Sequence, residues 1–339
     1  MAPPAGGVWE TSMHRRGRTV STVTLAFLLR ALAARAGEPG GQAPSPERSS
    51  FKAGVDVVAL DVTVLDPDRR FITDLQPGDF AVYEDGVQQD LAFFRHDGVP
   101  LDLAILIDSS ASMSDKLAVV RDAASGFVRT LRPQDRAAVV TFNTEARFAV
   151  PFTDDRAALF GAIARIDTGG ATALNNALYL ALNGFARDPV RRASTQIRRP
   201  AIVLLSDGED TASLVSFEQA LDLAKRAGVS VYPISIKTRY ATAIARHYVS
   251  DADLALRTLA LETGGQVSFP ERLQDLSIVY SQIASELISQ YSLGYTSKNP
   301  KRDGAWRNLV VRVLRAGAVP RAKRGYFAPG VGSTSRTTP

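Results

Sequence analysis

The sequence contains no cysteine and only three histidines among its 339 residues. A chain without thiols forms neither disulfides nor thiolate metal sites, and it carries no lipidated N-terminal cysteine. The histidines, His14, His96 and His247, are too few to favour a histidine-rich zinc site. These absences exclude a disulfide framework and argue against a zinc centre.

Three enzyme signatures are also missing from the sequence. It contains no Gly-x-Ser-x-Gly nucleophile motif, no phosphate-binding loop of the P-loop type and no His-Glu-x-x-His zinc motif. We therefore expect a protein that is not an enzyme. Apolar residues make up 45% of the chain and charged residues 22%, as in ordinary globular proteins, and the length is sufficient for two domains.

The small net charge of +5 conceals an uneven distribution. Residues 298–339 contain ten basic residues and one acidic residue, and residues 1–50 contain six basic and three acidic residues. A basic chain can indicate nucleic-acid binding, but here the charge is confined to the ends and no nucleic-acid motif accompanies it. We interpret the basic ends as solvated surface and expect no nucleic-acid partner.

The N-terminal region has the features of a targeting sequence. Basic residues at 14–18 precede the apolar stretch Val20–Leu29, and Ala34-Arg-Ala36 fits a small-x-small cleavage site. This pattern predicts a signal peptide over residues 1–36 and a secreted or periplasmic protein. Arg30 interrupts the pattern, so a disordered basic leader is the alternative.

The apolar stretch is too short for a confident membrane span, so we expect no stable membrane insertion. A start at Met13 would give a more typical signal peptide. Residues 37–50 are rich in glycine, proline and serine and are typical of a linker. At the other end, we expect residues 329–339 to form a disordered tail.

The most informative stretch is an apolar run that ends in Asp108-x-Ser110-x-Ser112. Its leucine and isoleucine residues show no alternation, which is typical of a strand buried on both faces. Carboxylate and hydroxyl oxygens at the end of such a strand suit Mg²⁺, a hard ion that prefers octahedral oxygen coordination. The alternative is a serine-rich turn in which Asp or Ser caps the next helix.

Two later stretches favour the metal site. Residues 168–174 form a glycine-rich loop that offers the hydroxyl of Thr172. The stretch 201–209 contains a second buried strand, which ends at Asp207. Together the three motifs resemble the metal-ion-dependent adhesion site of von Willebrand factor type A domains, over about residues 98–290. The resemblance implies one divalent ion, Mg²⁺ with Mn²⁺ or Ca²⁺ as alternatives. The ligands it implies are Asp108, Ser110, Ser112, Thr172 and Asp207.

From Pro100 onward the sequence alternates strand and helix patterns. This order predicts an α/β fold with a doubly wound, mostly parallel sheet. We expect strands at 101–107, 137–142, 201–206 and 229–236, an edge strand at 147–150 and a short strand at 266–269. We expect helices at 115–131, 154–166, 173–186, 216–227, 251–262 and 271–290, with a basic loop at 187–199.

Both ends of the globular region have β-strand patterns instead. Residues 51–97 contain an alternating strand around 58–64 and a hairpin of 79–84 and 87–94, whose Asp85-Gly86 turn suits type I′. Residues 291–328 contain candidates at 291–296, 306–314 and 323–327. Because two or three strands rarely stabilise themselves, we expect one discontinuous, smaller β-sandwich built from both chain ends. The alternative is two independent β pieces.

A narrower resemblance rests on these end segments. The leader at 54–95, Gln290-Tyr-Ser-Leu-Gly-Tyr295 and Arg324-Gly-Tyr326 are similar to the von Willebrand factor A-related proteins abundant in Acidobacteria. The family resemblance implies that the ion captures an acidic side chain of a protein partner. Two protein carboxylates roughly neutralise a dication, which leaves it electrophilic toward one more carboxylate. The alternatives are a structural module with a purely structural ion, or a metal-dependent hydrolase.

One loop is a candidate for partner recognition. Residues 237–251 follow a strand end on the same side of the predicted sheet as Asp108. Arginine and tyrosine are over-represented in binding hot spots, so we expect this loop to contact the partner. The candidate contact residues are Arg239, Tyr240, Arg246, His247 and Tyr248. The alternative is an ordinary solvated connection.

Overall fold

The computed structural model describes residues 57–330, except for 195, 208 and 237–249. The predicted signal peptide and linker therefore lie outside the described residues, as does most of the predicted tail. No helix in the described part combines the length and the apolar character needed to cross a membrane.

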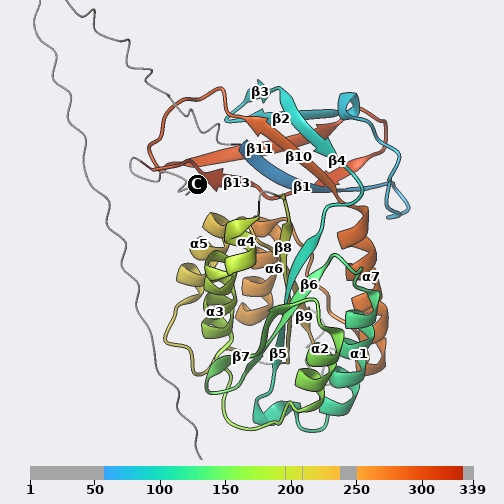
Figure 1. Cartoon of the computed structure of the whole chain (residues 1–339), viewed down its shortest axis with the longest axis vertical. Coiled ribbons are helices and arrows are strands. Elements are labelled where there is room, and N and C mark those ends of the chain that lie inside the picture. Colours follow the sequence, from blue (N-terminus) through green and yellow to red (C-terminus); the bar gives the residue numbers. More distant parts are fainter. Residues whose placement is uncertain (1–56, 195, 208, 237–249, 331–339) are drawn as a thin grey trace, which may run out of the picture. The chain divides into compact units, whose positions relative to one another are not determined.

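A five-stranded sheet forms the centre of the α/β part, in the order β7-β6-β5-β8-β9 (Figure 1). Four strands are parallel and β7 pairs antiparallel with β6 at the edge. Every residue of β5, β6 and β8 is buried, which explains the unbroken apolar runs in the sequence. The strands are β5 Leu101–Asp108, β6 Arg136–Phe142, β7 Ala146–Thr153, β8 Arg199–Ser206 and β9 Ser230–Ser235.

Helices cover both faces of this sheet (Figure 1). One face packs against α1 Leu117–Thr130, α2 Arg156–Ala164 and α7 Leu276–Ser289. The other face packs against α3 Leu174–Arg187, α5 Phe217–Ala227 and α6 Asp251–Thr263. Residues of β5 alternate between these two cores, with Ile105 in one and Leu106 in the other.

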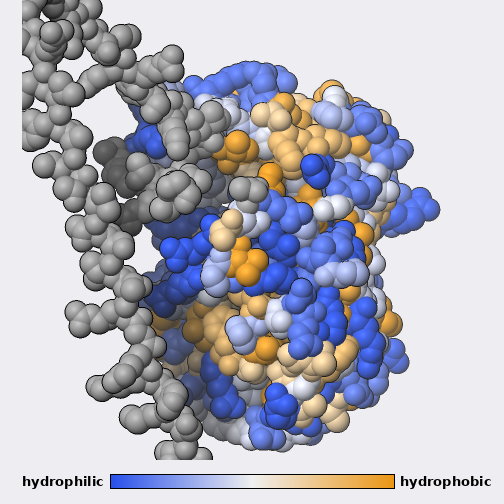
Figure 2. Space-filling model, in the orientation of Figure 1, coloured by the Kyte–Doolittle hydropathy of each residue, from blue (hydrophilic) through white to orange (hydrophobic). Residues whose placement is uncertain are grey.

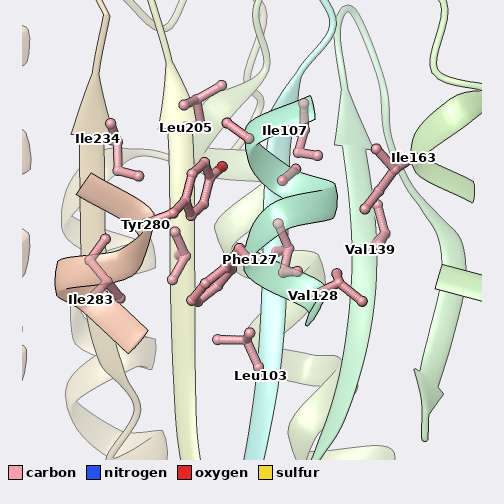
Figure 3. Packing of buried hydrophobic residues seen from close by; sticks show 14 of the residues in the cluster. Leu103, Ile107, Phe127, Val128, Val139, Ile163, Leu205, Ile234, Tyr280 and Ile283 are labelled. Atoms are coloured by element: carbon pink, nitrogen blue, oxygen red, sulfur yellow. The ribbon is translucent and has the colours of Figure 1, made fainter. Parts of the chain in front are cut away.

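Aromatic rings close the core beneath α1 and α7. The rings of Phe127 and Tyr280 lie 5.0 Å apart above the strands (Figure 3). Both side chains are almost completely buried, and such aromatic pairs add to the stabilisation from burial alone. The two helices are therefore fixed to each other as well as to the sheet.

The chain ends form two four-stranded antiparallel sheets, ordered β12-β1-β10-β4 and β13-β11-β2-β3. Strand β1 pairs with β10, with Val62 opposite Tyr291, so the predicted association of the two ends is confirmed. One hydrophobic core lies between the sheets and takes residues from both ends. The strands are β1 Val57–Leu65, β2 Phe80–Glu84, β3 Val87–Gln89, β4 Leu91–Arg95, β10 Tyr291–Thr296, β11 Trp306–Val313, β12 Val319–Arg321 and β13 Gly325–Phe327.

The predicted single strand over 87–94 is wrong. The chain breaks at Asp90, so β3 completes a hairpin with β2 while β4 crosses to the other sheet and pairs with β10. This switch lets one segment supply side chains to both layers of the sandwich. The hairpin turn itself is as expected, because Asp85 and Gly86 have φ values of 47° and 84°.

The segment 187–199 is not simply a loop. It contains the short helix α4 Pro189–Ala193, whose N-cap Asp188 accepts a hydrogen bond from the Arg191 amide (3.1 Å). An aspartate followed by proline is a helix-start signal, which the basic composition obscured. Strand β8 then begins at Arg199, two residues earlier than expected.

Three smaller differences concern segment boundaries. The predicted strand 266–269 is reduced to one isolated bridge between Ile234 and Ser268. The last helix begins as a 3₁₀ turn, Leu273–Asp275, before α7. Strand β12 occupies residues expected to separate two strands, because it pairs with the end of β1.

Candidate metal centre

Two aspartates lie at the carboxyl ends of neighbouring strands. Asp108 is the last residue of β5 and is fully buried, and Asp207 directly follows β8. Asp108 accepts hydrogen bonds from the Ser110 amide (2.9 Å) and the Ser206 hydroxyl (2.6 Å). In open α/β sheets this edge is where ligands bind.

A chain of hydrogen-bonded oxygens joins the two aspartates. The hydroxyl oxygens of Ser110 and Ser112 lie 3.1 Å apart, and Ser112 Oγ donates to Asp207 Oδ1 (2.8 Å). In an octahedral site with metal–oxygen distances of about 2.1 Å, adjacent ligand oxygens lie about 3 Å apart. These oxygens thus already have the spacing of neighbouring Mg²⁺ ligands.

Thr172 belongs to a loop that is fastened to this edge. The Gly169 amide donates to Ser109 O (2.9 Å), and Gly170 O accepts from the Ala111 amide (3.1 Å). Thr172 is itself buried, and its backbone bonds with Thr211. Within the described structure its hydroxyl makes no hydrogen bond to the other four candidate ligands, so Thr172 is not part of the oxygen chain although its loop is fastened to the same edge.

The glycines of this loop have different roles. Gly170 has a φ of 76°, and a Cβ at this position would collide with the Thr144 hydroxyl. Gly169 has no such φ, and a Cβ added there would meet no other atom within 4 Å. Only Gly170 therefore requires the absence of a side chain.

Lys116 is a member of the site that sequence reasoning missed. Its ammonium group contacts Asp207 Oδ2 and donates to Ser112 O (3.1 Å), while the two side chains are only 13% and 3% exposed. Lys116 lies four residues beyond Ser112, just before α1. That helical spacing was the one signal in the sequence that could have indicated its proximity.

The environment of Asp108 favours a cationic neighbour. Burial raises the pKa of its carboxyl group, the charge of Asp207 adds to the increase, and hydrogen bonds from Ser110 and Ser206 oppose it. A positive charge among these oxygens would stabilise the ionised carboxylate. The ammonium group of Lys116 lies next to Asp207, the other aspartate of this edge.

The donor set fits a hard divalent cation. It combines two carboxylates with hydroxyl oxygens. Among the described residues, no three or more Asp, Glu, His or Cys side chains lie together as a group that could hold a metal. Hydroxyl-rich oxygen coordination is typical of Mg²⁺ or Ca²⁺ rather than of zinc. The candidate partner residues, from Arg239 to Tyr248, lie outside the described structure.

The fold and these residues define an open α/β protein with a cluster of carboxylate and hydroxyl oxygens at the carboxyl edge of its sheet. The model of the von Willebrand factor type A domain family matches residues 102–278, slightly more than half of the chain. The chain therefore belongs to the von Willebrand factor type A domain family, as predicted. Proteins of this family are typically interaction modules rather than enzymes.

The chain is also similar to individual proteins. A UPF0353 protein of Mycolicibacterium paratuberculosis is 30% identical over 239 residues, covering 65% of this chain and 69% of the relative. A von Willebrand factor type A structure from Catenulispora acidiphila is 16% identical with a TM-score of 0.48, covering 76% of this chain and 74% of that one. Proximal thread matrix protein 1 of the mussel byssus, solved with a zinc-occupied adhesion site, is 19% identical with a TM-score of 0.47, covering 61% and 50%.

Proposed function

We propose that this protein is a non-enzymatic module that binds a protein partner through a divalent ion. The expected ion is Mg²⁺. The observation that carries the proposal is the hydrogen-bonded oxygen chain from Ser110 through Ser112 to Asp207, beside buried Asp108. Ser110, Ser112 and Thr172 would provide neutral oxygens, and the two aspartates would provide charge.

The bound ion would supply Lewis acidity toward an acidic side chain of the partner. The two aspartates roughly balance its charge, so one further carboxylate remains favourable. Lys116 reduces the net negative charge of the ligands, which also favours an incoming anion. Buried Asp108, fixed by Ser110 and Ser206, keeps the serine-rich turn in place while the partner binds.

A hydrolase is the less favoured function because none of the described residues around the two aspartates is a histidine that could act as a general base. Among the described residues the one histidine, His96, lies in the sandwich with its ring 4.6 Å from that of Tyr291. Lys116, the cationic group at the centre, is engaged by Asp207. The geometry therefore supports binding of a protein partner better than it supports hydrolysis.

We further propose that residues 237–251 select the partner and that the protein is secreted or periplasmic. The metal offers the same contact to any carboxylate, so selectivity requires neighbouring groups. Arg239 and Arg246 would attract acidic residues around the captured carboxylate, mainly affecting orientation and association rate. The sequence pattern of residues 1–36 supports export.

Metal-dependent capture tests this function. Immobilised wild-type protein is incubated with the native extracellular fraction in Mg²⁺ or in chelator, beside Asp207→Asn and, as a matched control, the exposed acid variant Glu209→Gln. We expect the same partner to be retained by wild type and Glu209→Gln in Mg²⁺ alone. Equal retention in chelator, together with a higher unfolding temperature in Mg²⁺, would indicate a purely structural ion instead.

A further inference from the structure

A second site lies at the opposite edge of the sheet from the metal centre. A cavity of about 790 Å³ opens between the sandwich and the amino end of β8. On the face shown in Figure 2, the surface is hollowed between these two parts and the surrounding side chains are largely hydrophilic. A volume of this size falls within the range of small-molecule sites.

The lining of this cavity is strongly cationic. It includes nine basic residues and one acidic residue, Asp61, which accepts a hydrogen bond from Ser292 (2.6 Å). The cations come largely from 187–199, which we expected to be a basic loop, and from 298–339, which we interpreted as solvated surface. The fold instead brings both segments to one concave site.

Some of these cations already have carboxylate partners. The ion pairs are Arg198 with Asp102, Lys225 with Glu262, Arg226 with Asp222, and Arg307 with Asp303. These four residues therefore contribute little uncompensated charge. An anionic ligand would have to be attracted by other cations of the lining, of which Arg191, Arg199 and Lys323 are the relevant ones.

Arg199 is the clearest of these. It is only 3% exposed, and among the described residues its guanidinium group has no ion pair with a carboxylate within 4 Å. Its hydrogen bonds are long ones to the carbonyls of Gln290 (3.3 Å) and Val99 (3.5 Å), and its Nε has none. The one acidic residue of the lining, Asp61, attracts Arg199 from beyond 4 Å and acts on Arg191 and Lys323 as well. A buried charge without a carboxylate in direct contact is costly, so an anion in the adjoining cavity would stabilise it.

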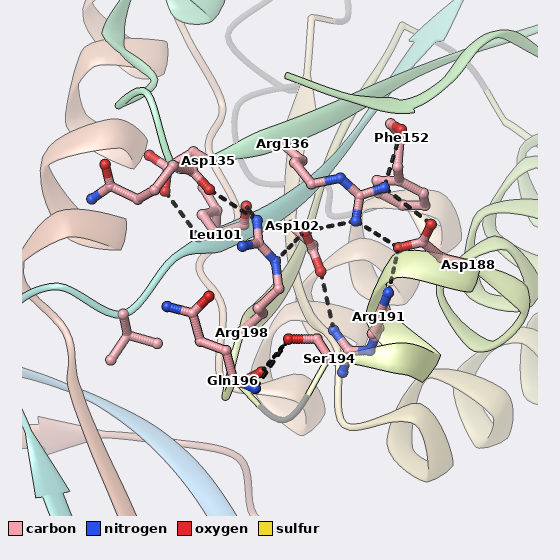
Figure 4. A network of polar contacts seen from close by, with 12 residues as sticks. Leu101, Asp102, Asp135, Arg136, Phe152, Asp188, Arg191, Ser194, Gln196 and Arg198 are labelled. Carbon is pink, nitrogen blue, oxygen red and sulfur yellow. Dashed lines mark hydrogen bonds and ion pairs between the residues drawn. The ribbon is translucent and has the colours of Figure 1, made fainter. Parts of the chain in front are cut away.

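Arg191 is a second under-compensated cation. Three guanidinium groups, those of Arg136, Arg191 and Arg198, surround the single carboxylate of Asp102 (Figure 4). Arg198 holds it at 2.8 Å, whereas Arg191 Nη1 is 3.8 Å away and has no hydrogen bond. Arg136 has its own partner in Asp188.

Lys323 approaches from the sandwich side. Its ammonium group donates to Ala59 O (2.7 Å) and lies within 4 Å of no carboxylate in the part of the chain that the structure describes. Burial lowers the pKa of its ammonium group, and the charge of Asp61 only partly opposes this, so a further anion nearby would favour the charged form. Arg191, Arg199 and Lys323 thus approach one cavity from α4, β8 and the β12–β13 connection.

We propose that this cavity binds a small molecule carrying two or more phosphate groups. Guanidinium groups match phosphate oxygens in paired hydrogen bonds, and an ammonium group adds a compact charge. Phe93, Tyr326 and Phe327 form part of the wall and would contact the remaining, less polar portion of the ligand. The site is separate from the metal centre and does not depend on the proposed partner binding.

Calorimetry with inorganic pyrophosphate and inorganic phosphate, both in chelator, tests the proposal. Chelator prevents binding through the metal centre, so the two sites are distinguished. We expect pyrophosphate to bind at least tenfold more tightly than phosphate and to raise the unfolding temperature. Citrate, a carboxylate of similar charge, should bind more weakly than pyrophosphate, and equal affinity would overturn the assignment to phosphate.

Three variants locate the binding. Arg199→Gln and Lys323→Gln should each weaken pyrophosphate binding at least tenfold. Arg312→Gln, an exposed cation of β11 outside the cavity, should bind as wild type does. If Arg199→Gln fails to fold, the pyrophosphate affinity of Lys323→Gln decides whether the cavity is the binding site. Absence of pyrophosphate binding at millimolar concentration, or equal losses in Arg312→Gln, would overturn the proposal.

Discussion

The ammonium group of Lys116 contacts Asp207 Oδ2 from a position 91 residues earlier in the chain. It also donates to the Ser112 carbonyl (3.1 Å), so it fixes the serine-rich turn against the end of β8. Asp207 is one of the two carboxylates assigned to the divalent ion. Lys116 and the ion would therefore compete for the same negative charge.

We expect Lys116→Met to bind Mg²⁺ more tightly than wild type, by about three- to thirtyfold. The substitution removes a positive charge next to the proposed ligands but preserves much of the apolar stem, and charges at such short range interact by a few kcal/mol. Isothermal titration calorimetry with Mg²⁺ measures the change. Lys298→Met, on the sandwich, is the control, and weaker Mg²⁺ binding by Lys116→Met would show that the lysine supports the site rather than competing.

The two aspartates should be needed for metal binding but not for folding. Asp108→Asn and Asp207→Asn retain side-chain shape and remove the charge, so each should weaken Mg²⁺ binding by about a hundredfold or more, equivalent to about 2.7 kcal/mol. Calorimetry gives the affinity, and far-ultraviolet circular dichroism checks the fold. Glu209→Gln should behave as wild type. Unchanged affinity in a folded Asp108→Asn protein would refute the ligand assignment.

A pair of adjacent glycines tests how the Thr172 loop is positioned. Gly170→Ala places a Cβ against the Thr144 hydroxyl at a φ of 76°, so the loop that carries Thr172 must change its position. We expect Mg²⁺ affinity to fall about tenfold and stability to fall by about 1–3 kcal/mol. Gly169→Ala has open space and should change neither quantity by much. Equal effects in the two variants would mean that loop geometry does not control the site.

Local patterns predicted much of this structure. The unbroken apolar run before Asp108 and the alternation around Val62 each encode burial directly, so the α/β sheet and the paired ends were predictable. The residues of Asp-x-Ser-x-Ser are close in sequence, and strand-end geometry brings them to Asp207. The Lys116–Asp207 contact was not predictable in this way, because it depends on how α1 starts relative to β8.

The burial of Arg199 and the passage of the chain from one sheet to the other at Asp90 were harder to predict from the sequence. The basic composition of 187–199 gave no indication that Arg199 would be buried, since burial follows from the sandwich covering the amino end of β8. The break at Asp90 likewise depends on the partner strands, because β3 and β4 are short and pair with different sheets. Such features are set by tertiary packing, which overrides local propensity.

A buried polar network joins the α/β part to the sandwich. Glu286 of α7 is 5% exposed and accepts hydrogen bonds from Tyr232 of β9 (2.9 Å) and Thr63 of β1 (3.2 Å). It also pairs with Arg321 of β12. Burial and the neighbouring Glu286 carboxylate hold the pKa of Tyr232 above its ordinary value, so the phenol remains a neutral donor.

Glu286→Ala should reduce the free energy of unfolding by about 3–5 kcal/mol, because it leaves Arg321 without its partner and two hydroxyls without their acceptor. Glu286→Gln preserves the shape and one acceptor oxygen, so the loss should be smaller, about 1–3 kcal/mol. Ser285→Ala, the exposed neighbour on α7, should change stability by no more than about 0.5 kcal/mol. Urea denaturation followed by circular dichroism measures all three. If Glu286→Ala unfolds at the wild-type midpoint, the network does not hold the two parts together, and apolar packing alone must account for their association.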